Sequence, residues 1–323
     1  MNNNIKDYQW PSFFIKPNQS YNLKYEKKID IKLVNELEDY FQKYYGFKII
    51  LFPSARAGVA SILRFLKIDR SKEVFVNKWV SYCIFNTVGR YTNISTSFKA
   101  PDVALAIHKW GFEQIIPKKK NIKIIEDSVD TIIENKNDLF ENKGDFEIIS
   151  LPKIIGSVSG GIVITKNLNF YKYAKKEQTK NRELGKYQSR LKFADINKKK
   201  TFHSWLYHES TNTFLEYNAL LNIEKCLKNF QINKKIILER KEYLEENFDK
   251  AGFKFKRLGP VIPIKYKIIK NHELMSKYFL LRRIHKDKYK IHTFEKVYLL
   301  PIHFKITHKK FKFYLGILKK CLQ

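Results

Sequence analysis

The chain has 323 residues, of which 62 are Lys or Arg and 32 are Asp or Glu, so its formal charge is +30. Hydrophobic residues make up 44% and aromatic residues 15%, which excludes wholesale disorder, and the length suits one large domain or two of ordinary size. No uncharged apolar run reaches the roughly 20 residues of a membrane-spanning helix, and no apolar signal segment opens the sequence. The sequence therefore predicts a soluble, cytoplasmic protein.

Short β-branched or aromatic runs predict buried strands in the first half of the chain. These runs are residues 48–52, 73–76, 122–125, 146–149 and 161–165. After Ser54, apolar residues recur at helical spacing from Val59 to Leu66, which predicts a helix after the first strand. Strands that alternate with helices favour an α/β fold with a mainly parallel sheet.

The last hundred residues have a different pattern. Residues 222–247 are strongly helical and charged, residues 261–264 and 297–301 are extended, and an amphipathic helix carrying Phe311 and Leu318 on one face ends the chain. This pattern predicts a smaller α+β domain. We expect a large domain over residues 1–221 and a small C-terminal domain over residues 222–323.

Cysteine and histidine spacing gives no sign of a metal site or of a disulfide framework. The three cysteines are far apart, and the pairs His203/His208 and His303/His308 are each five residues apart, which is not the spacing of ligands on one helical face. The positive charge is spread along the chain and is densest over residues 172–200, which we interpret as a solvated helix and loop. Such a surface would attract an anionic small substrate.

Three segments carry residues suited to chemistry. Asp127 follows a predicted parallel strand, where ligands bind in open α/β sheets. Ser150 and Lys153 follow the next strand, and a buried lysine there can form a Schiff base. The small-residue turn that follows Ser54 leads into a helix, whose first amides can bind a phosphate. Each signal alone is also compatible with an ordinary cap, an exposed lysine or a plain turn.

The order and spacing of these segments resemble the DegT/DnrJ/StrS family of pyridoxal phosphate (PLP) sugar aminotransferases, over nearly the whole chain. The resemblance implies the aspartate-aminotransferase fold, with a three-layer large domain. It implies that Ala55 and Arg56 belong to the turn that binds the cofactor phosphate, together with Ser150. It further implies that Trp79 stacks on the pyridine ring and that Lys153 is the Schiff-base lysine.

Other positions follow from the same motifs. Asp127 matches the Asp that pairs with the pyridine nitrogen, and Asp130 stands where Gln or His usually approaches the cofactor's phenolic oxygen. Asn212 matches the Asn that reaches the partner subunit's cofactor phosphate, although the Arg of that motif is absent. Arg56 replaces a Thr, and two residues separate Ser150 from Lys153 where the family generally has four. These departures predict an atypical substrate pocket.

The resemblance implies a homodimeric aminotransferase that uses PLP and glutamate to aminate a keto sugar for surface polysaccharide. The acceptor would be nucleotide-linked or phosphorylated. One alternative is a relative with dehydratase activity or without transamination. Another is a protein that uses its charge to bind nucleic acid or an acidic polymer, although no motif for specific nucleic-acid binding is present.

Overall fold

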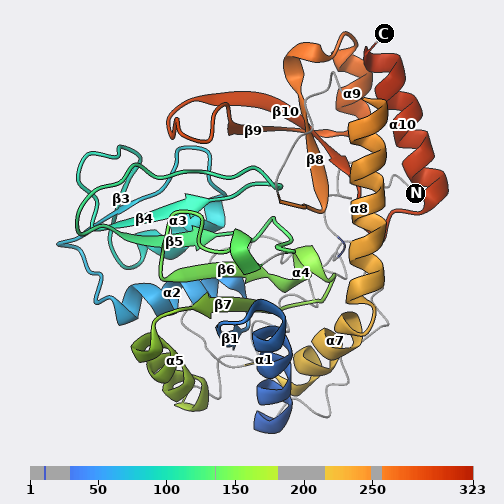
Figure 1. Cartoon of the computed structure of the whole chain (residues 1–323). Coiled ribbons are helices and arrows are strands. Elements are labelled where there is room, and N and C mark those ends of the chain that lie inside the picture. Colours follow the sequence, from blue (N-terminus) through green and yellow to red (C-terminus); the bar gives the residue numbers. More distant parts are fainter. Residues whose placement is uncertain (1–10, 12–29, 135, 181–214, 249–256, 323) are drawn as a thin grey trace, which may run out of the picture.

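The computed structural model describes residues 11, 30–134, 136–180, 215–248 and 257–322. Its first part is built around a seven-stranded sheet in the order β1-β7-β6-β5-β4-β2-β3 (Figure 1). The strands are β1 (Lys48–Phe52), β2 (Glu73–Phe75), β3 (Asn93–Ser95), β4 (Val103–Ile107), β5 (Lys123–Asp127), β6 (Phe146–Ser150) and β7 (Gly161–Thr165). Strands β6, β5, β4, β2 and β3 pair in parallel, and β7 runs antiparallel to both of its neighbours.

Alternating side chains of this sheet pack into two separate hydrophobic layers. On one face, Ile50 and Val163 pack with α2 (Ala55–Phe65), α3 (Tyr82–Gly89) and α5 (Leu168–Lys180). On the other face, Ile49 and Ile164 pack with α1 (Ile31–Tyr45), α7 (Tyr217–Leu227) and α8 (Phe230–Asn247). Successive strand residues point to opposite faces, so each strand serves both layers. The arrangement is the three-layer α/β fold with a mainly parallel sheet that the sequence predicts.

The C-terminal part contains a second, antiparallel sheet in the order β8-β10-β9. Its elements are β8 (Val261–Lys265), α9 (His272–Tyr278), β9 (Leu280–His285), β10 (Phe294–Pro301) and α10 (His308–Leu322), with short 3-10 turns at Lys136–Asp138 and Tyr266–Ile268. The face of α10 that contacts the core includes Phe311 and Leu318 as predicted, together with Tyr314. This part is the smaller α+β unit expected from the sequence.

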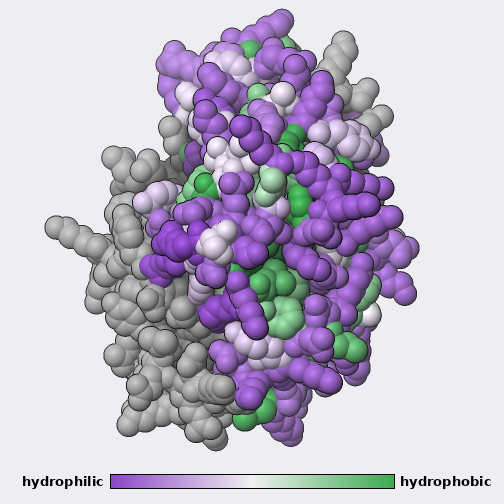
Figure 2. Space-filling view, turned by 90° about the vertical axis from the view of Figure 1, so that its left-hand side faces the viewer, coloured by the Kyte–Doolittle hydropathy of each residue, from purple (hydrophilic) through white to green (hydrophobic). Residues whose placement is uncertain are grey.

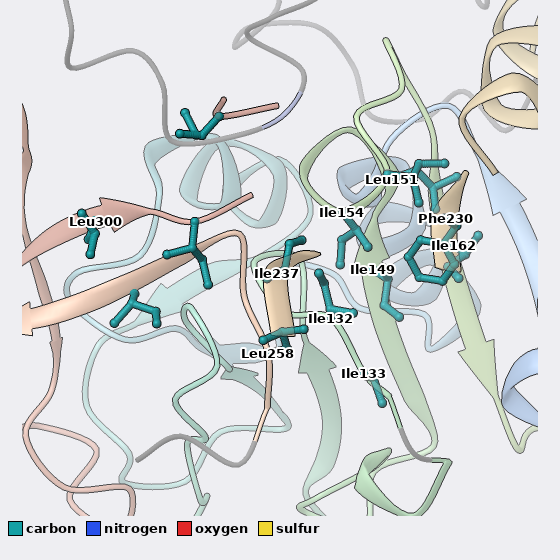
Figure 3. Packing of buried hydrophobic residues seen from close by; sticks show 14 of the residues in the cluster. Ile132, Ile133, Ile149, Leu151, Ile154, Ile162, Phe230, Ile237, Leu258 and Leu300 are labelled. Atoms are coloured by element: carbon teal, nitrogen blue, oxygen red, sulfur yellow. The ribbon is translucent and has the colours of Figure 1, made fainter. Parts of the chain in front are cut away.

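One hydrophobic cluster joins the two sheets. In Figure 3, Leu300 of β10 lies on one side of the cluster and Ile149 of β6 on the other, with Ile132, Ile237 and Leu258 between them. The backbone amide of Ile132 also donates to the carbonyl of Leu258 at 2.6 Å. The predicted boundary between residues 221 and 222 falls within α7, and the division into two domains stays a prediction.

Candidate active site

The carboxyl ends of the central strands meet at one edge of the large sheet. Register brings Phe52 and Ser150 each beside Gly161, and Ile107 beside Asp127. The predicted segments that follow β1, β5 and β6 are therefore neighbours in space, although about a hundred residues separate the first from the last. This edge is where open α/β sheets bind ligands.

Lys153 and Asp130 form an ion pair at this edge. Lys153 lies on α4 (Leu151–Ile154), the short helix after β6, and its Nζ donates to Asp130 Oδ1 at 2.7 Å. Burial is the largest single effect and disfavours the charged amine, but the charge and hydrogen bond of Asp130, with the nearby Cys83 and Asp127, together raise the pKa of Lys153. About a quarter of the lysine side chain remains exposed, at 26%. Lys153 is therefore held as a cation within reach of a ligand.

Asp127 is a buried carboxylate at the end of β5, with 1% of its surface exposed. Its Oδ1 accepts a hydrogen bond from the amide of Val129 at 3.2 Å. Burial raises the pKa of Asp127 to about 6, against the opposing charge of Lys153. A buried carboxylate at a ligand-binding edge is suited to hold a proton on a cationic partner.

Its neighbour Glu126 points to the other side of the strand and has a structural role. Its carboxylate accepts from Asn142 and Gly144 amides and from the Nε2–H of His108 at 2.9 Å, while His108 Nδ1 accepts from the amide of Gln114. Burial works against the charge, but these hydrogen bonds outweigh it and lower the pKa of Glu126. Glu126 thus orders the loops on either side of β5.

A buried arginine supports the same loops from the C-terminal part. Arg257 Nη1 lies 3.1 Å from Glu147 Oε1 and donates to Ser128 Oγ at 2.9 Å. Both charged side chains are fully buried, so the pair fixes the loop after β5 to β6 and to the segment before β8. Sequence reasoning did not identify Arg257, because its partner Glu147 is 110 residues away.

The turn after β1 places the start of a helix at this edge of the sheet. Ser54 caps α2, accepting from the amide of Ala57 at 3.2 Å, and the helix begins at Ala55. A Cβ added at Gly161 would lie 2.3 Å from the nitrogen of Ala55, so only glycine allows β7 to approach this turn so closely. First-turn amides have no acceptor within their helix and attract anions. Arg56 is the second residue of α2, and burial lowers its pKa.

Trp79 lies after β2 at the same edge, and 38% of its surface is exposed. Its ring is covered by a cation, because Arg283 Cζ of β9 lies 3.9 Å from the ring centroid. Its carbonyl accepts a hydrogen bond from Lys109 Nζ. Burial lowers the pKa of Lys109 to about 8, and Lys153 adds to the shift. Sequence reasoning missed Lys109 because it missed β4, the strand that positions it.

The remaining predictions fall partly outside the described residues. Asn212 lies outside them, and so do residues 181–200 of the basic stretch at residues 172–200. Within the described ranges, no group of three or more His, Cys, Asp or Glu side chains could hold a metal ion. No described helix is long and apolar enough to cross a membrane.

These residues fit a cofactor that carries a phosphate, a carbonyl carbon and a basic ring nitrogen. The Ser54 turn and Ser150 offer donors for a phosphate, and the buried carboxylate of Asp127 offers a partner for a protonated nitrogen. Lys153 offers an amine at the same edge. The close approach of Gly161 to Ala55, which a single Cβ would prevent, is the structural observation that supports this fit.

Comparisons with known proteins agree with this fit. Residues 37–319 match a family model described as "Putative PLP-dependent aminotransferase". A sequence search of curated proteins finds no match.

Several solved structures share the fold at low sequence identity. DesI, solved in the presence of its TDP-sugar product, is 12% identical with a TM-score of 0.62, and the alignment covers 91% of this chain and 86% of DesI. Helicobacter pylori PseC, an aminotransferase of pseudoaminic acid biosynthesis, is 11% identical with a TM-score of 0.60. The alignment covers 93% of this chain and 94% of PseC. Serine palmitoyltransferase K265A from S. paucimobilis, with a bound PLP–myriocin aldimine, is 10% identical with a TM-score of 0.53, covering 98% and 86%. At these identities the likeness shows the fold alone.

Proposed function

The chain belongs to this family of PLP-dependent aminotransferases, and on that premise we propose that it aminates a keto sugar with glutamate as the amino donor. The observation that carries the site assignment is the meeting of Lys153, Asp130 and Asp127 at one sheet edge beside the start of α2. The donor's amino group ends on the acceptor carbon, and the donor leaves as 2-oxoglutarate.

Lys153 is the residue that would hold the cofactor and transfer protons. Its Nζ would take up the proton that leaves the substrate carbon and would return a proton in the reverse direction. To attack a carbonyl carbon, the amine must first lose the proton that Asp130 stabilises at 2.7 Å. Asp130 therefore controls how readily Lys153 becomes a nucleophile.

The other predicted residues bind and orient. Asp127 would hold a proton on the pyridine nitrogen of the bound cofactor, which would supply an electron sink for the bonds at the substrate carbon. Ala55, Arg56 and Ser150 would bind the phosphate, with Arg56 contributing charge in place of the family's hydroxyl. Trp79 covers the ring.

Support for a sugar acceptor comes from two sources. The motif series resembles the DegT/DnrJ/StrS family, and two of the solved structures that share the fold, DesI and PseC, are a protein solved with its TDP-sugar product and an aminotransferase of pseudoaminic acid biosynthesis. A nucleotide-linked or phosphorylated acceptor also suits a chain with a formal charge of +30. We propose a role in surface polysaccharide synthesis and a homodimeric state on the same resemblance.

The visible absorption spectrum of the purified protein with PLP tests this function. We expect a band from lysine-bound cofactor that shifts when L-glutamate is added, with release of about one 2-oxoglutarate per site. Lys153→Ala should lack both the band and the release. Candidate nucleotide-linked keto sugars should then restore the original band.

Two other outcomes would favour a different function. A band that persists without 2-oxoglutarate release would favour a PLP-binding relative with dehydratase activity or without transamination. If no band differs from that of dissolved PLP, while DNA or RNA binds with a steep dependence on salt, the charge-based alternative would stand instead.

A further inference from the structure

Two cations from distant segments, Lys109 and Arg283, contact Trp79 at the candidate active site, and Lys78 Nζ lies 5.9 Å from the Trp79 ring centroid. Lys109 follows β4 and donates to the Trp79 carbonyl, and Arg283 of β9 covers the Trp79 ring at 3.9 Å. Arg282 is adjacent on β9, and its charge contributes to lowering the pKa of Lys109. We call Lys109, Arg282 and Arg283 the Trp79 cation cluster.

The small sheet brings the two arginines to this place. The side chain of Asn77 contacts His285 Nε2 at 3.3 Å, which ties the segment before Trp79 to the end of β9. Trp110 and Phe112, from the loop that carries Lys109, pack against Ile284 of β9. Two sheets therefore hold the cluster in position from both sides.

No carboxylate of the described part of the chain lies within 4 Å of a nitrogen in the cluster, whereas Lys153, Lys175 and Arg257 each have such a partner. Asp130 is the acid that most raises the pKa of Lys109, and the carboxylate of Asp130 is hydrogen-bonded to Lys153. Partly buried like charges repel one another, and an anion placed among them would relieve that repulsion. An anion would therefore be attracted to this place.

The cluster also lies beside the proposed chemistry. Lys109 is two residues beyond Ile107, which pairs with Asp127, and the amide of His108 donates to the Asp127 carbonyl at 2.9 Å. Figure 2 shows the face formed by the left-hand side of Figure 1, where hydrophilic side chains cover most of the surface around a central group of hydrophobic ones. Cations beside Lys153 can orient an anionic substrate.

We propose that the Trp79 cation cluster is an anion-binding subsite that takes a phosphate or carboxylate group of the substrate. This inference rests on the proposed function, because it supplies the recognition of an anionic reactant next to Lys153. Arginine is suited to either group, since its planar fork binds both bidentately.

Isothermal titration of the PLP-loaded protein with inorganic diphosphate, and separately with glutarate, tests the subsite. Diphosphate represents a nucleotide-linked acceptor, and glutarate represents the donor's carboxylates without its amine. We expect at least one probe to bind, and Arg283→Gln or Arg282→Gln to weaken that binding about 10-fold, the size of one lost charge-assisted hydrogen bond. Lys312→Gln, on the exposed side of α10, changes the net charge equally and should leave it within about 2-fold.

The outcomes separate the possibilities. If Arg283→Gln or Arg282→Gln weakens the binding of diphosphate, the subsite takes the acceptor. If either variant weakens the binding of glutarate, the subsite takes the donor. Equal weakening by Lys312→Gln and Arg283→Gln, or no binding of either probe, would overturn the subsite. Arg283→Lys keeps the charge and is the control for misfolding. It should bind the probe more tightly than Arg283→Gln does. The titration measures binding and requires no turnover. If neither probe binds but the cofactor is still attached at Lys153, the subsite proposal fails while the proposed function stands.

Discussion

At the scale of single residues, Asp127 carries the clearest conflict between folding and function. Its carboxylate is buried at the end of β5, and its pKa rises from 3.8 to about 6. The folded state therefore binds the proton more tightly than the unfolded state. Stability from this group is complete below about pH 4 and is lost as the pH rises through about 6.

Asp127→Asn should therefore stabilise the protein prepared without PLP at pH 8. The shift corresponds to roughly 2 to 3 kcal/mol in the free energy of unfolding, at about 1.4 kcal/mol per pKa unit. Urea unfolding at pH 8 and at pH 4 measures it, and the gain should nearly vanish at pH 4, where Asp127 is already protonated. If Asp127→Asn lowers the free energy of unfolding at pH 8, the interactions of the carboxylate stabilise the fold by more than its burial destabilises it.

Asp130 stands where the resembled family has Gln or His, and it holds the proton on Lys153. Asp130→Asn should lower the pKa of Lys153 and speed covalent attachment of PLP at neutral pH, by about 10-fold for each unit of pKa. Stopped-flow absorbance after mixing with PLP measures the rate. Asp69→Asn, in the exposed loop before β2, is the matched control. Slower attachment in Asp130→Asn would show that Asp130 is needed to orient the amine.

At the scale of elements, the contact between β7 and the start of α2 shapes the proposed phosphate site. The absence of a side chain at Gly161 is what permits it, because a Cβ would lie 2.3 Å from the Ala55 nitrogen and 2.6 Å from the Ser54 carbonyl carbon. Both are backbone atoms, so neither can move aside cheaply.

Gly161→Ala should destabilise the protein by about 1 to 3 kcal/mol and weaken PLP binding about 10-fold or more. Gly316→Ala is the matched control, because no atom lies within 4 Å of its added Cβ in α10. Alanine there should stabilise the helix by about 0.5 to 1 kcal/mol. Thermal unfolding and a PLP titration measure both variants, and an unchanged PLP affinity in Gly161→Ala would contradict the placing of the phosphate.

Sequence patterns predicted most of the strands, including the extended segments that form β8 and β10, and missed β3, β4 and β9. Strands β1, β2, β5, β6 and β7 are apolar runs with clear ends, and all five are confirmed. Strand β4 was missed because Ala104 and Ala106 alternate with its larger residues, and β9 was missed because Arg282 and Arg283 interrupt it. The antiparallel direction of β7 depends on pairing over long distances, which periodicity does not report.

The same limit applies to the site. Lys153, Asp127, Ser150 and the Ser54 turn could be found because each follows a recognisable strand. The Lys153–Asp130 pair, the buried Arg257 and the cover of Trp79 by Arg283 join residues 23, 110 and about 200 positions apart. Such contacts come from the tertiary fold, so only the structure reveals them.

At the scale of the whole molecule, the surface beside the site bears on assembly. Trp79 and Tyr82 are 38% and 59% exposed and flank Val80 at the start of α3. Exposed aromatic residues grouped together are typical of protein interfaces. We predict that this surface contributes to the homodimer expected from the family resemblance.

Light scattering coupled to size-exclusion chromatography tests the dimer. The wild type should have about twice the mass of one chain, and Tyr82→Glu should shift the protein towards the monomer because a charge enters an apolar interface. Tyr289→Glu, at an equally exposed tyrosine on the β9–β10 hairpin, should leave the dimer intact. A wild-type monomer, or equal effects of the two substitutions, would contradict this assignment of the interface.

The measurement that tests the central claim most directly is reductive trapping of the cofactor. The protein is loaded with PLP, reduced with borohydride and digested, and mass spectrometry locates the pyridoxyl group. We predict a label of about one per chain on Lys153, none in Lys153→Ala, and unchanged labelling in Lys109→Gln. A label on Lys109, or labels scattered over surface lysines with no preference for Lys153, would contradict the assignment.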